Sequence, residues 1–207
     1  MARPPRCRLY LVTPPAFEPA AFSRELAVAL DAGDVACLQV KVNDASPEDA
    51  RRIIDALRPI AHERDVAVIL NGPPDLARAT GCDGIHLNEQ RGYAEARRIL
   101  GAKAIVGVAC HTSRHEGMVA AEAGADYVVF GPFFGDPSRC ATSDLIEWWG
   151  DLMEIPVVAT GGITPENCHA LVEAGADFIA VSSSLWNHPD GPGAAVRAFL
   201  RAMTRQA

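Results

Sequence analysis

The stretch Ala174-Gly175-Ala176-Asp177-Phe178-Ile179-Ala180-Val181 decides the fold, because its pattern occurs four times along the chain. In each copy a glycine ends a helix, a polar residue turns the chain, and a short apolar run follows. Such a run is typical of a strand that is buried on both faces. The other copies lie at residues 32–38, 80–87 and 123–130. Their separation of roughly forty to fifty residues fits one or two strand–helix units each.

The intervals between the copies contain further strands and helices. Ser46 and Pro47 predict a helix that begins with a serine cap and a proline in its first turn, and Thr164 and Pro165 predict a second start of this kind. The expected strands cover residues 7–12, 35–41, 67–70, 84–87, 104–108, 127–130, 156–159 and 178–181. The expected helices cover residues 20–32, 47–64, 92–100, 114–123, 145–153 and 193–204, with one more from residue 164.

Strict alternation of strands and helices predicts a parallel sheet, and eight units predict that the sheet closes. We therefore expect an α/β protein with a single-domain (β/α)₈ TIM barrel over residues 1–207. The alternative is an open, doubly wound sheet. That fold normally has a glycine-rich loop after its first strand, whereas this chain has Thr13-Pro14-Pro15 there.

Composition narrows the classes of partner. The formal net charge is −7, with acids and bases mixed along the chain, so we expect no nucleic acid partner. No apolar stretch of about 18 residues exists, and the start of the chain does not resemble a signal peptide, so we expect no membrane contact and a cytoplasmic protein. The six cysteines form no C-x-x-C pair and are expected to be reduced, with Cys110 at a strand end the one to watch.

In a barrel of this kind the site lies where the strands end, and the loops after the last two strands frequently bind phosphate. Gly161 and Gly162 would let backbone N–H groups approach an anion, and Ser182 and Ser183 would add further donors near a possible helix N-terminus. The alternative is that the glycines only form a tight turn. Lys41 and Arg139 follow other strands and are either cations over the barrel mouth or solvated surface charges.

His111 is the candidate general acid or base, because histidine titrates near neutral pH. The alternative is a structural histidine that binds a loop carbonyl. His86 lies within a strand and is expected to have a core or supporting role. The other histidines, His62, His115, His169 and His188, are expected to be exposed. Asp34, Asp83, Asp126 and Asp177 precede strands at the opposite end of the barrel and are interpreted as structural.

Several strand ends together resemble the thiamine-phosphate synthase family and its TenI-like relatives, over nearly the whole chain. The residues that carry the resemblance are Leu9-Tyr10-Leu11-Val12-Thr13, Gln39 with Lys41, Asp83-Gly84-Ile85-His86-Leu87, Gly107-Val108-Ala109-Cys110-His111-Thr112, Ala125-Asp126-Tyr127 with Gly131-Pro132, and Gly161-Gly162-Ile163. The resemblance implies that Gln39, Lys41, Asn71, Ser138 and Arg139 contact a substrate, together with the glycine and serine pairs.

The chain departs from the family pattern where the family binds Mg²⁺. The family's carboxylates follow strands 3 and 4, and this chain has Gly72 and Arg91 there; it also has Asn43 for a cation and Ala109 for a serine. Magnesium prefers carboxylate oxygens, so we expect no metal ligand and no cofactor, with Mg²⁺ needed only by a working synthase. Arg91 could replace the ion as a fixed charge, or Glu89 could be a displaced ligand.

Three functions follow from the resemblance. The leading expectation is a TenI-like thiazole tautomerase, in which His111 moves a proton on a thiazole phosphate. The second is a divergent thiamine-phosphate synthase, which joins a pyrimidine diphosphate to a thiazole phosphate. The third is a non-catalytic protein that binds thiamine-related phosphates. In each case the partner is a small molecule, a thiazole phosphate or thiamine phosphate, and the family suggests a homo-oligomer.

Overall fold

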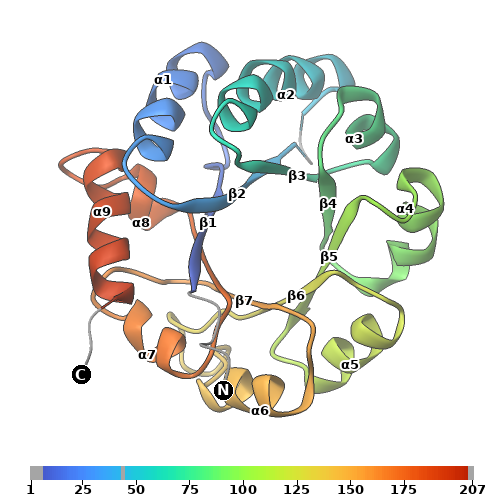
Figure 1. Cartoon of the computed structure of the whole chain (residues 1–207), viewed down its shortest axis with the longest axis vertical. Helices are drawn as coiled ribbons and strands as arrows, with labels where there is room; N and C mark the ends of the chain where they lie inside the picture. The colour runs from blue at the N-terminus through green and yellow to red at the C-terminus, as the bar shows by residue number, and fades with distance from the viewer. Residues whose placement is uncertain (1–6, 43–44, 205–207) are drawn as a thin grey trace.

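The computed structural model, which describes residues 7–42 and 45–204, is a closed barrel of parallel strands surrounded by helices (Figure 1). The strands follow one another around the barrel in sequence order, and the last pairs with the first, Leu9 opposite Ile179. They are β1 (Arg8–Val12), β2 (Val35–Lys41), β3 (Ala67–Asn71), β4 (Gly84–Leu87), β5 (Ile105–His111), β6 (Tyr127–Phe130), β7 (Val157–Thr160) and β8 (Phe178–Val181). The predicted closed barrel is thus confirmed, and the open sheet is excluded.

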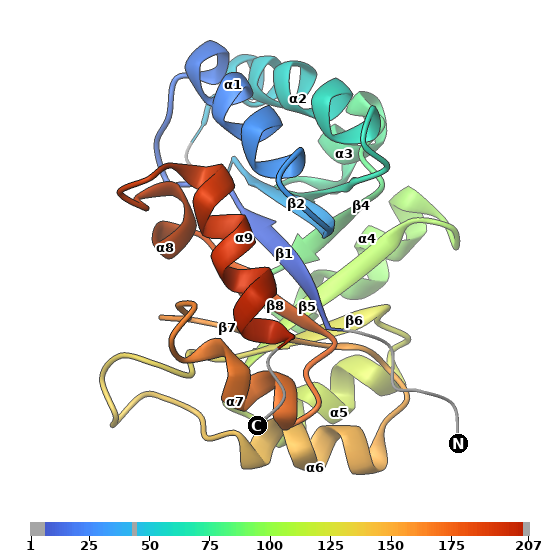
Figure 2. The same cartoon turned by 60° about the vertical axis from the view of Figure 1, so that its left-hand side comes forward.

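The helices form the outer layer, seen from two sides in Figures 1 and 2. They are α1 (Pro19–Leu30), α2 (Pro47–His62), α3 (Pro74–Thr80), the 3₁₀ turn η1 (Gln90–Gly92), α4 (Tyr93–Leu100), α5 (Arg114–Glu122), α6 (Asp144–Leu152), α7 (Cys168–Glu173), α8 (Ser183–Trp186) and α9 (Pro192–Met203). Ser46 caps α2 as predicted, accepting a hydrogen bond from the Asp49 N–H. None of the described helices is long and apolar enough to cross a membrane.

Three local predictions were wrong. The helix expected from Thr164 begins only at Cys168, and residues 165–167 form a turn before it. In this turn the Asn167 side chain accepts from the Thr164 N–H at 2.8 Å and donates to the Gly162 carbonyl at 3.1 Å, and the Cys168 N–H donates to the Thr164 carbonyl at 3.0 Å, so the turn leads directly into α7. The short helix α3 was not predicted, whereas α8 begins at Ser183, where a helix start was indicated. Strand β5 runs on to His111 instead of ending at residue 108.

The four repeated aspartates hold the start of the barrel strands together in pairs. Asp83, Asp126 and Asp177 each stand just before an even-numbered strand, and each accepts a hydrogen bond from the first N–H groups of the strand before it: Val68 at 2.7 Å, Val106 at 2.7 Å and Val157 at 2.8 Å. Asp34, just before β2, joins the starts of β1 and β2 through an ion pair with Arg8 at 2.7 Å. The structural interpretation of these residues is confirmed.

The core has an inner and an outer layer. Inside the barrel Tyr10, Cys37, Ile69 and Tyr127 pack with residues of β6 to β8. Between the sheet and the helices, Trp149 packs edge-on against Phe130. All six cysteines are free, as expected. Cys110 is fully buried, and burial raises the pKa of its thiol to about 12, so it remains a protonated apolar residue.

Candidate functional site

Two adjoining cavities open where the barrel strands end. The central cavity, of about 310 Å³, lies over the barrel axis and is lined by residues that include Gln39, Asn71, His86 and His111. The second, of about 690 Å³, lies toward β7, β8 and the start of α8. Five residues line both cavities: Val12, Lys41, Thr160, Gly161 and Ala180. A ligand with two parts can therefore extend from one cavity into the other past Lys41.

Glycine is required at positions 161 and 162. Both residues have positive φ, 93° and 66°. A Cβ at Gly161 would lie 2.4 Å from Cα of Pro132, and one at Gly162 would lie 2.3 Å from the carbonyl oxygen of Phe134. The loop after β6 therefore packs directly on the glycine pair, and the Phe134 N–H donates to the Gly161 carbonyl at 3.0 Å.

The serine loop after β8 lies beside the glycine pair. Ser184 Oγ donates to the Ile163 carbonyl at 2.7 Å, which joins the loops after β7 and β8. Gly161, Gly162, Ser182, Ser183 and Lys41 all line the second cavity. The structure thus brings together five of the residues that the sequence assigned to phosphate, and hydroxyl groups, backbone N–H groups and an ammonium are suited to such an anion.

The floor of the central cavity is a chain of buried polar side chains. The Tyr10 hydroxyl lies 3.0 Å from Gln39 Oε1 and 2.9 Å from the Tyr127 hydroxyl, which lies 3.3 Å from Nδ1 of His86. Burial lowers the pKa of His86 to about 4, with nearby Lys41 and His111 contributing, and burial raises the pKa of both tyrosines. All of these side chains are therefore neutral at pH 7. His86 is buried, as its expected core or supporting role implies, but it also lines the central cavity.

Asn71 is fixed beside this floor. It is buried, and its Nδ2 donates to the His86 carbonyl at 2.9 Å and to Asn88 Oδ1 at 3.1 Å. These contacts hold the end of β3 against the end of β4. Because Asn71 also lines the central cavity, it takes the place in the mouth that the sequence assigned to it.

His111 ends β5 in an unusual backbone conformation. Its φ is 50°, and the register with β6 shifts between Ala109 and His111. Residues other than glycine rarely adopt a positive φ, and those that do cluster at functional sites. Its carbonyl accepts from the Gly131 N–H at 2.9 Å, and the side chain is exposed. The bulge places the imidazole at the central cavity and also at a third one, of about 470 Å³.

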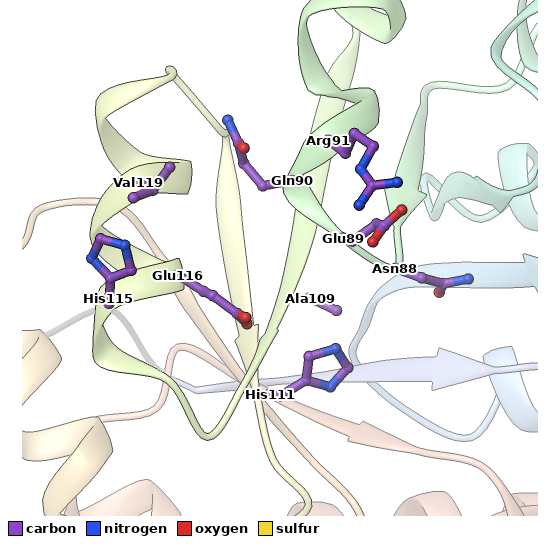
Figure 3. A pocket seen from close by; sticks show the side chains of 9 residues that line it. All are labelled: Asn88, Glu89, Gln90, Arg91, Ala109, His111, His115, Glu116 and Val119. Carbon is purple, nitrogen blue, oxygen red and sulfur yellow. The ribbon is translucent and has the colours of Figure 1, made fainter.

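The third cavity lies between η1 and α5. In Figure 3, Glu89 and Arg91 stand on the side of this cavity opposite His115, with His111 below them. His115 is exposed, as predicted, whereas His62, His169 and His188 are half-buried. His62 pairs with Asp83 at 2.8 Å, far from the mouth at the start of the strands.

Ser138 and Arg139 lie apart from the other predicted site residues. Both are exposed in the loop after β6, where the Ser138 N–H and hydroxyl bind the Asp136 carboxylate at 3.0 and 2.9 Å. Neither residue is among those that line these three cavities or a fourth one, of about 520 Å³, at the ends of β2, β3 and β4. Their role in substrate binding therefore remains a prediction.

The residues present do not fit a carboxylate site for magnesium. A Cβ at Gly72 would lie 2.7 Å from Cγ2 of Val42, so a valine methyl occupies the space where a side chain at 72 would begin. Arg91 brings a positive charge to the other expected position. No group of three or more His, Cys, Asp or Glu side chains that could hold a metal occurs within residues 7–42 and 45–204. Asn43, also a departure from the family pattern, lies outside the described residues.

Sequence reasoning assigned no role to Tyr10, Tyr127, Thr13 and Thr160, which line the mouth or support it. A signal existed, because Tyr10 lies within the apolar run of β1 and Tyr127 stands at the start of the apolar run of β6. Polar groups inside a barrel need partners. Which partners they have depends on strands that lie far apart along the chain, and no pattern within one segment shows them.

Fold and mouth together define a (β/α)₈ barrel with a polar site at the carboxyl ends of its strands. The model of the family described as thiamine monophosphate synthase matches residues 9–185, so the chain belongs to this family. A protein of Rhodospirillum centenum named thiamine-phosphate synthase is 56% identical over 202 residues, covering 95% of this chain and 98% of that protein. A protein of the same name from Hyphomonas neptunium is 44% identical over 205 residues, covering 94% and 93%.

A comparison with solved structures also supports membership of this family. The thiamine phosphate pyrophosphorylase from Pyrococcus furiosus superposes with a TM-score of 0.85 at 26% sequence identity, over 96% of each chain. The family resemblance seen in the sequence is thus confirmed. The names of these relatives favour the second of the three expected functions over the first.

Proposed function

We propose that this protein is a transferase that joins a pyrimidine methyl diphosphate to a thiazole phosphate and releases diphosphate. The observation that carries the proposal is the pair of adjoining cavities that meet at Lys41, one with a cradle suited to phosphate and one with a floor suited to a heteroaromatic ring. The names of the relatives support it.

The geometry suggests how the work is divided. Gly161, Gly162, Ser182 and Ser183 hold the phosphate of the thiazole, and Gln39 and His86 contact the pyrimidine ring. Lys41, which lines both cavities, faces the diphosphate as a point charge. In the reaction the bond between the pyrimidine methylene carbon and the diphosphate oxygen breaks, and the thiazole nitrogen lone pair forms the new bond to that carbon. Such a site accelerates the reaction mainly by holding both reactants in line.

We propose no resident metal for this chain, because Gly72 and Arg91 stand where carboxylates would be needed. The test is a transfer assay with both substrates at millimolar Mg²⁺ and, separately, with excess chelator, in which diphosphate and thiamine phosphate are quantified together. Lys41→Met should reduce turnover about tenfold or more, whereas Lys103→Met, an exposed lysine in the loop before β5, should leave it unchanged. Absence of both products under all conditions would contradict the proposal.

The second candidate is thiazole tautomerisation, which His111 at the central cavity favours. The substrate is then a thiazole phosphate carboxylate alone, and a proton is moved on its ring. The assay is the same protein with this substrate and no pyrimidine. Binding of the phosphates without turnover of either kind would instead support a non-catalytic binding protein. Assembly into a homo-oligomer remains a prediction, which light scattering would test.

A further inference from the structure

The buried side chains of Gln39, Tyr10, Tyr127 and His86 form a hydrogen-bonded series in which the donor and the acceptor of each bond can be assigned. It has three hydrogen-bond contacts, and the two tyrosines, 2% and 6% exposed, bring one hydroxyl hydrogen each. Both phenols stay protonated, because burial raises the pKa of each. The direction of the first hydrogen bond therefore fixes the direction of all the others.

The direction is set by Gln39. Its Oε1, which only accepts, faces the Tyr10 hydroxyl, so the Tyr10 hydrogen is used there. The Tyr10 oxygen then accepts from the Tyr127 hydroxyl, and the Tyr127 oxygen is left as an acceptor for Nδ1 of His86. A neutral imidazole carries one hydrogen, and this geometry requires it on Nδ1.

We infer that Tyr10 and Tyr127 are positioning residues that hold His86 in its Nδ1–H tautomer, so that Nε2 meets a ligand as a hydrogen-bond acceptor. No hydrogen bond joins Nε2 to another residue in the part of the chain that the structure describes, and His86 lines the central cavity. At the other end of the chain, the Gln39 amide has Nε2 left as a donor. The floor thus offers one acceptor and one donor whose characters are coupled through two tyrosines.

The packing inside the barrel holds the side chains of this hydrogen-bonded series in place. A Cβ at Gly107 would lie 1.9 Å from Cζ of Tyr127, so the glycine makes the room in which the tyrosine ring lies. The Tyr10 and Tyr127 rings meet edge to face at 6.0 Å, and the rings of His86 and Tyr127 are nearly parallel, at 16°. Neither tyrosine can turn away without displacing core residues.

The coupled floor fits one class of ring. A heteroaromatic ligand that brings an amino group toward His86 and a ring nitrogen toward Gln39 satisfies both, whereas an analogue with a carbonyl in place of the amino group meets the His86 acceptor with a second acceptor. Such a mismatch leaves buried polar groups unpaired and costs about tenfold or more in affinity. The choice of ring rests on the proposed function; the tautomer of His86 does not.

The test of the tautomer is ¹⁵N NMR of the ligand-free protein with labelled histidine, with His86 assigned by its loss in His86→Gln. We expect the wild type to show Nδ1–H. In Tyr10→Phe the Tyr127 hydroxyl loses its acceptor and donates to Nδ1, so His86 should change to Nε2–H, although Tyr10 does not touch it. Gln39→Glu, in which the side chain still accepts, should keep Nδ1–H. A wild type with Nε2–H, or a Tyr10→Phe spectrum without the change, would overturn the inference.

A binding measurement checks the consequence with 4-amino-5-hydroxymethyl-2-methylpyrimidine and its 4-oxo analogue as probes. The wild type should prefer the amino compound by about tenfold, and Tyr10→Phe should lose this preference while the circular dichroism spectrum stays native. If the tautomer changes as expected but neither pyrimidine binds, the proposed function fails and the positioning role stands. If the preference persists in Tyr10→Phe, the positioning role is wrong.

Discussion

Thr13 Oγ1 accepts a hydrogen bond from the backbone N–H of Lys41 at 3.1 Å, and this contact joins the ends of β1 and β2 beneath the mouth. Thr13 is itself 1% exposed, and its N–H donates to the Gln39 carbonyl at 3.0 Å. One buried threonine therefore fixes the backbone on both sides of Val40. The position of Lys41, which lines both cavities, depends on it.

Replacing this threonine should affect ligand binding and stability together. Thr13→Val keeps the shape of the side chain but leaves the Lys41 N–H without its acceptor, which should cost about 1–2 kcal/mol of unfolding free energy. The affinity for inorganic phosphate should fall severalfold, because Lys41 is less well held. Urea denaturation and calorimetry measure the two effects. Thr204→Val, at the exposed end of α9, is the matched control and should change neither.

The glycine pair should not tolerate even one added methyl group. Gly161→Ala combines φ near 93° with a contact of 2.4 Å to backbone, so we expect a loss of about 2 kcal/mol or more in stability and of phosphate binding. Gly150→Ala is the control, since this glycine lies in α6 with open space around it. That variant should gain about 0.5–1 kcal/mol. Equal effects of the two substitutions would refute the steric argument.

Acid should destabilise the protein through His86. Burial lowers its pKa from 6.5 to about 4, so the unfolded chain takes up this proton first as the pH falls. The stabilisation is complete above pH 6.5 and is lost toward pH 4, by about 3 kcal/mol at 1.36 kcal/mol per pKa unit. Denaturation of wild type and His86→Gln at pH 7 and pH 4 measures this difference. His115→Gln, an exposed histidine, should follow the wild type.

His111 separates the two candidate reactions. A thiazole nitrogen that attacks with its lone pair has no proton to lose, so His111→Asn should lower the transfer rate by less than about tenfold. Tautomerisation needs an acid or base, and the same variant should lower it by about a hundredfold or more. Asparagine is the right replacement, because it tolerates the positive φ at this position. A large loss in the transfer assay would show that His111 does more than line the cavity.

The barrel could be predicted because its signal is local and repeated. Each copy of the glycine, polar residue and apolar run carries its own turn and its own strand, so the four copies place β2, β4, β6 and β8, and the apolar runs between them give the other four strands. Helix α3 was missed because seven residues are too few to show helical periodicity, and of the four-residue helix α8 only the start could be indicated. The start predicted at Thr164 lies one turn too early, because residues 165–167 form a turn that Asn167 joins to Thr164 and that leads into α7.

The site was only partly predictable for a related reason. Glycine and serine loops follow the last two strands directly, so their meeting in the second cavity follows from topology. The Tyr10–Tyr127 contact joins β1 to β6 across the barrel, over 117 residues of sequence. The positions of Ser138 and Arg139 could not be predicted either, because they lie in a long loop, and a long loop does not fix where its side chains point.

The four aspartates divide the barrel into successive strand pairs: β1 with β2, β3 with β4, β5 with β6, and β7 with β8. Each pair carries its own aspartate contact at the end remote from the ligand, so two adjacent strands form a repeated structural unit. Because each of these aspartate side chains binds within its own pair, a pair from a related barrel could be exchanged at the boundaries before β3, β5 and β7 once its hydrogen bonds to the neighbouring strands re-form. Loops at the mouth could then be recombined without separating an aspartate from the strand that it binds.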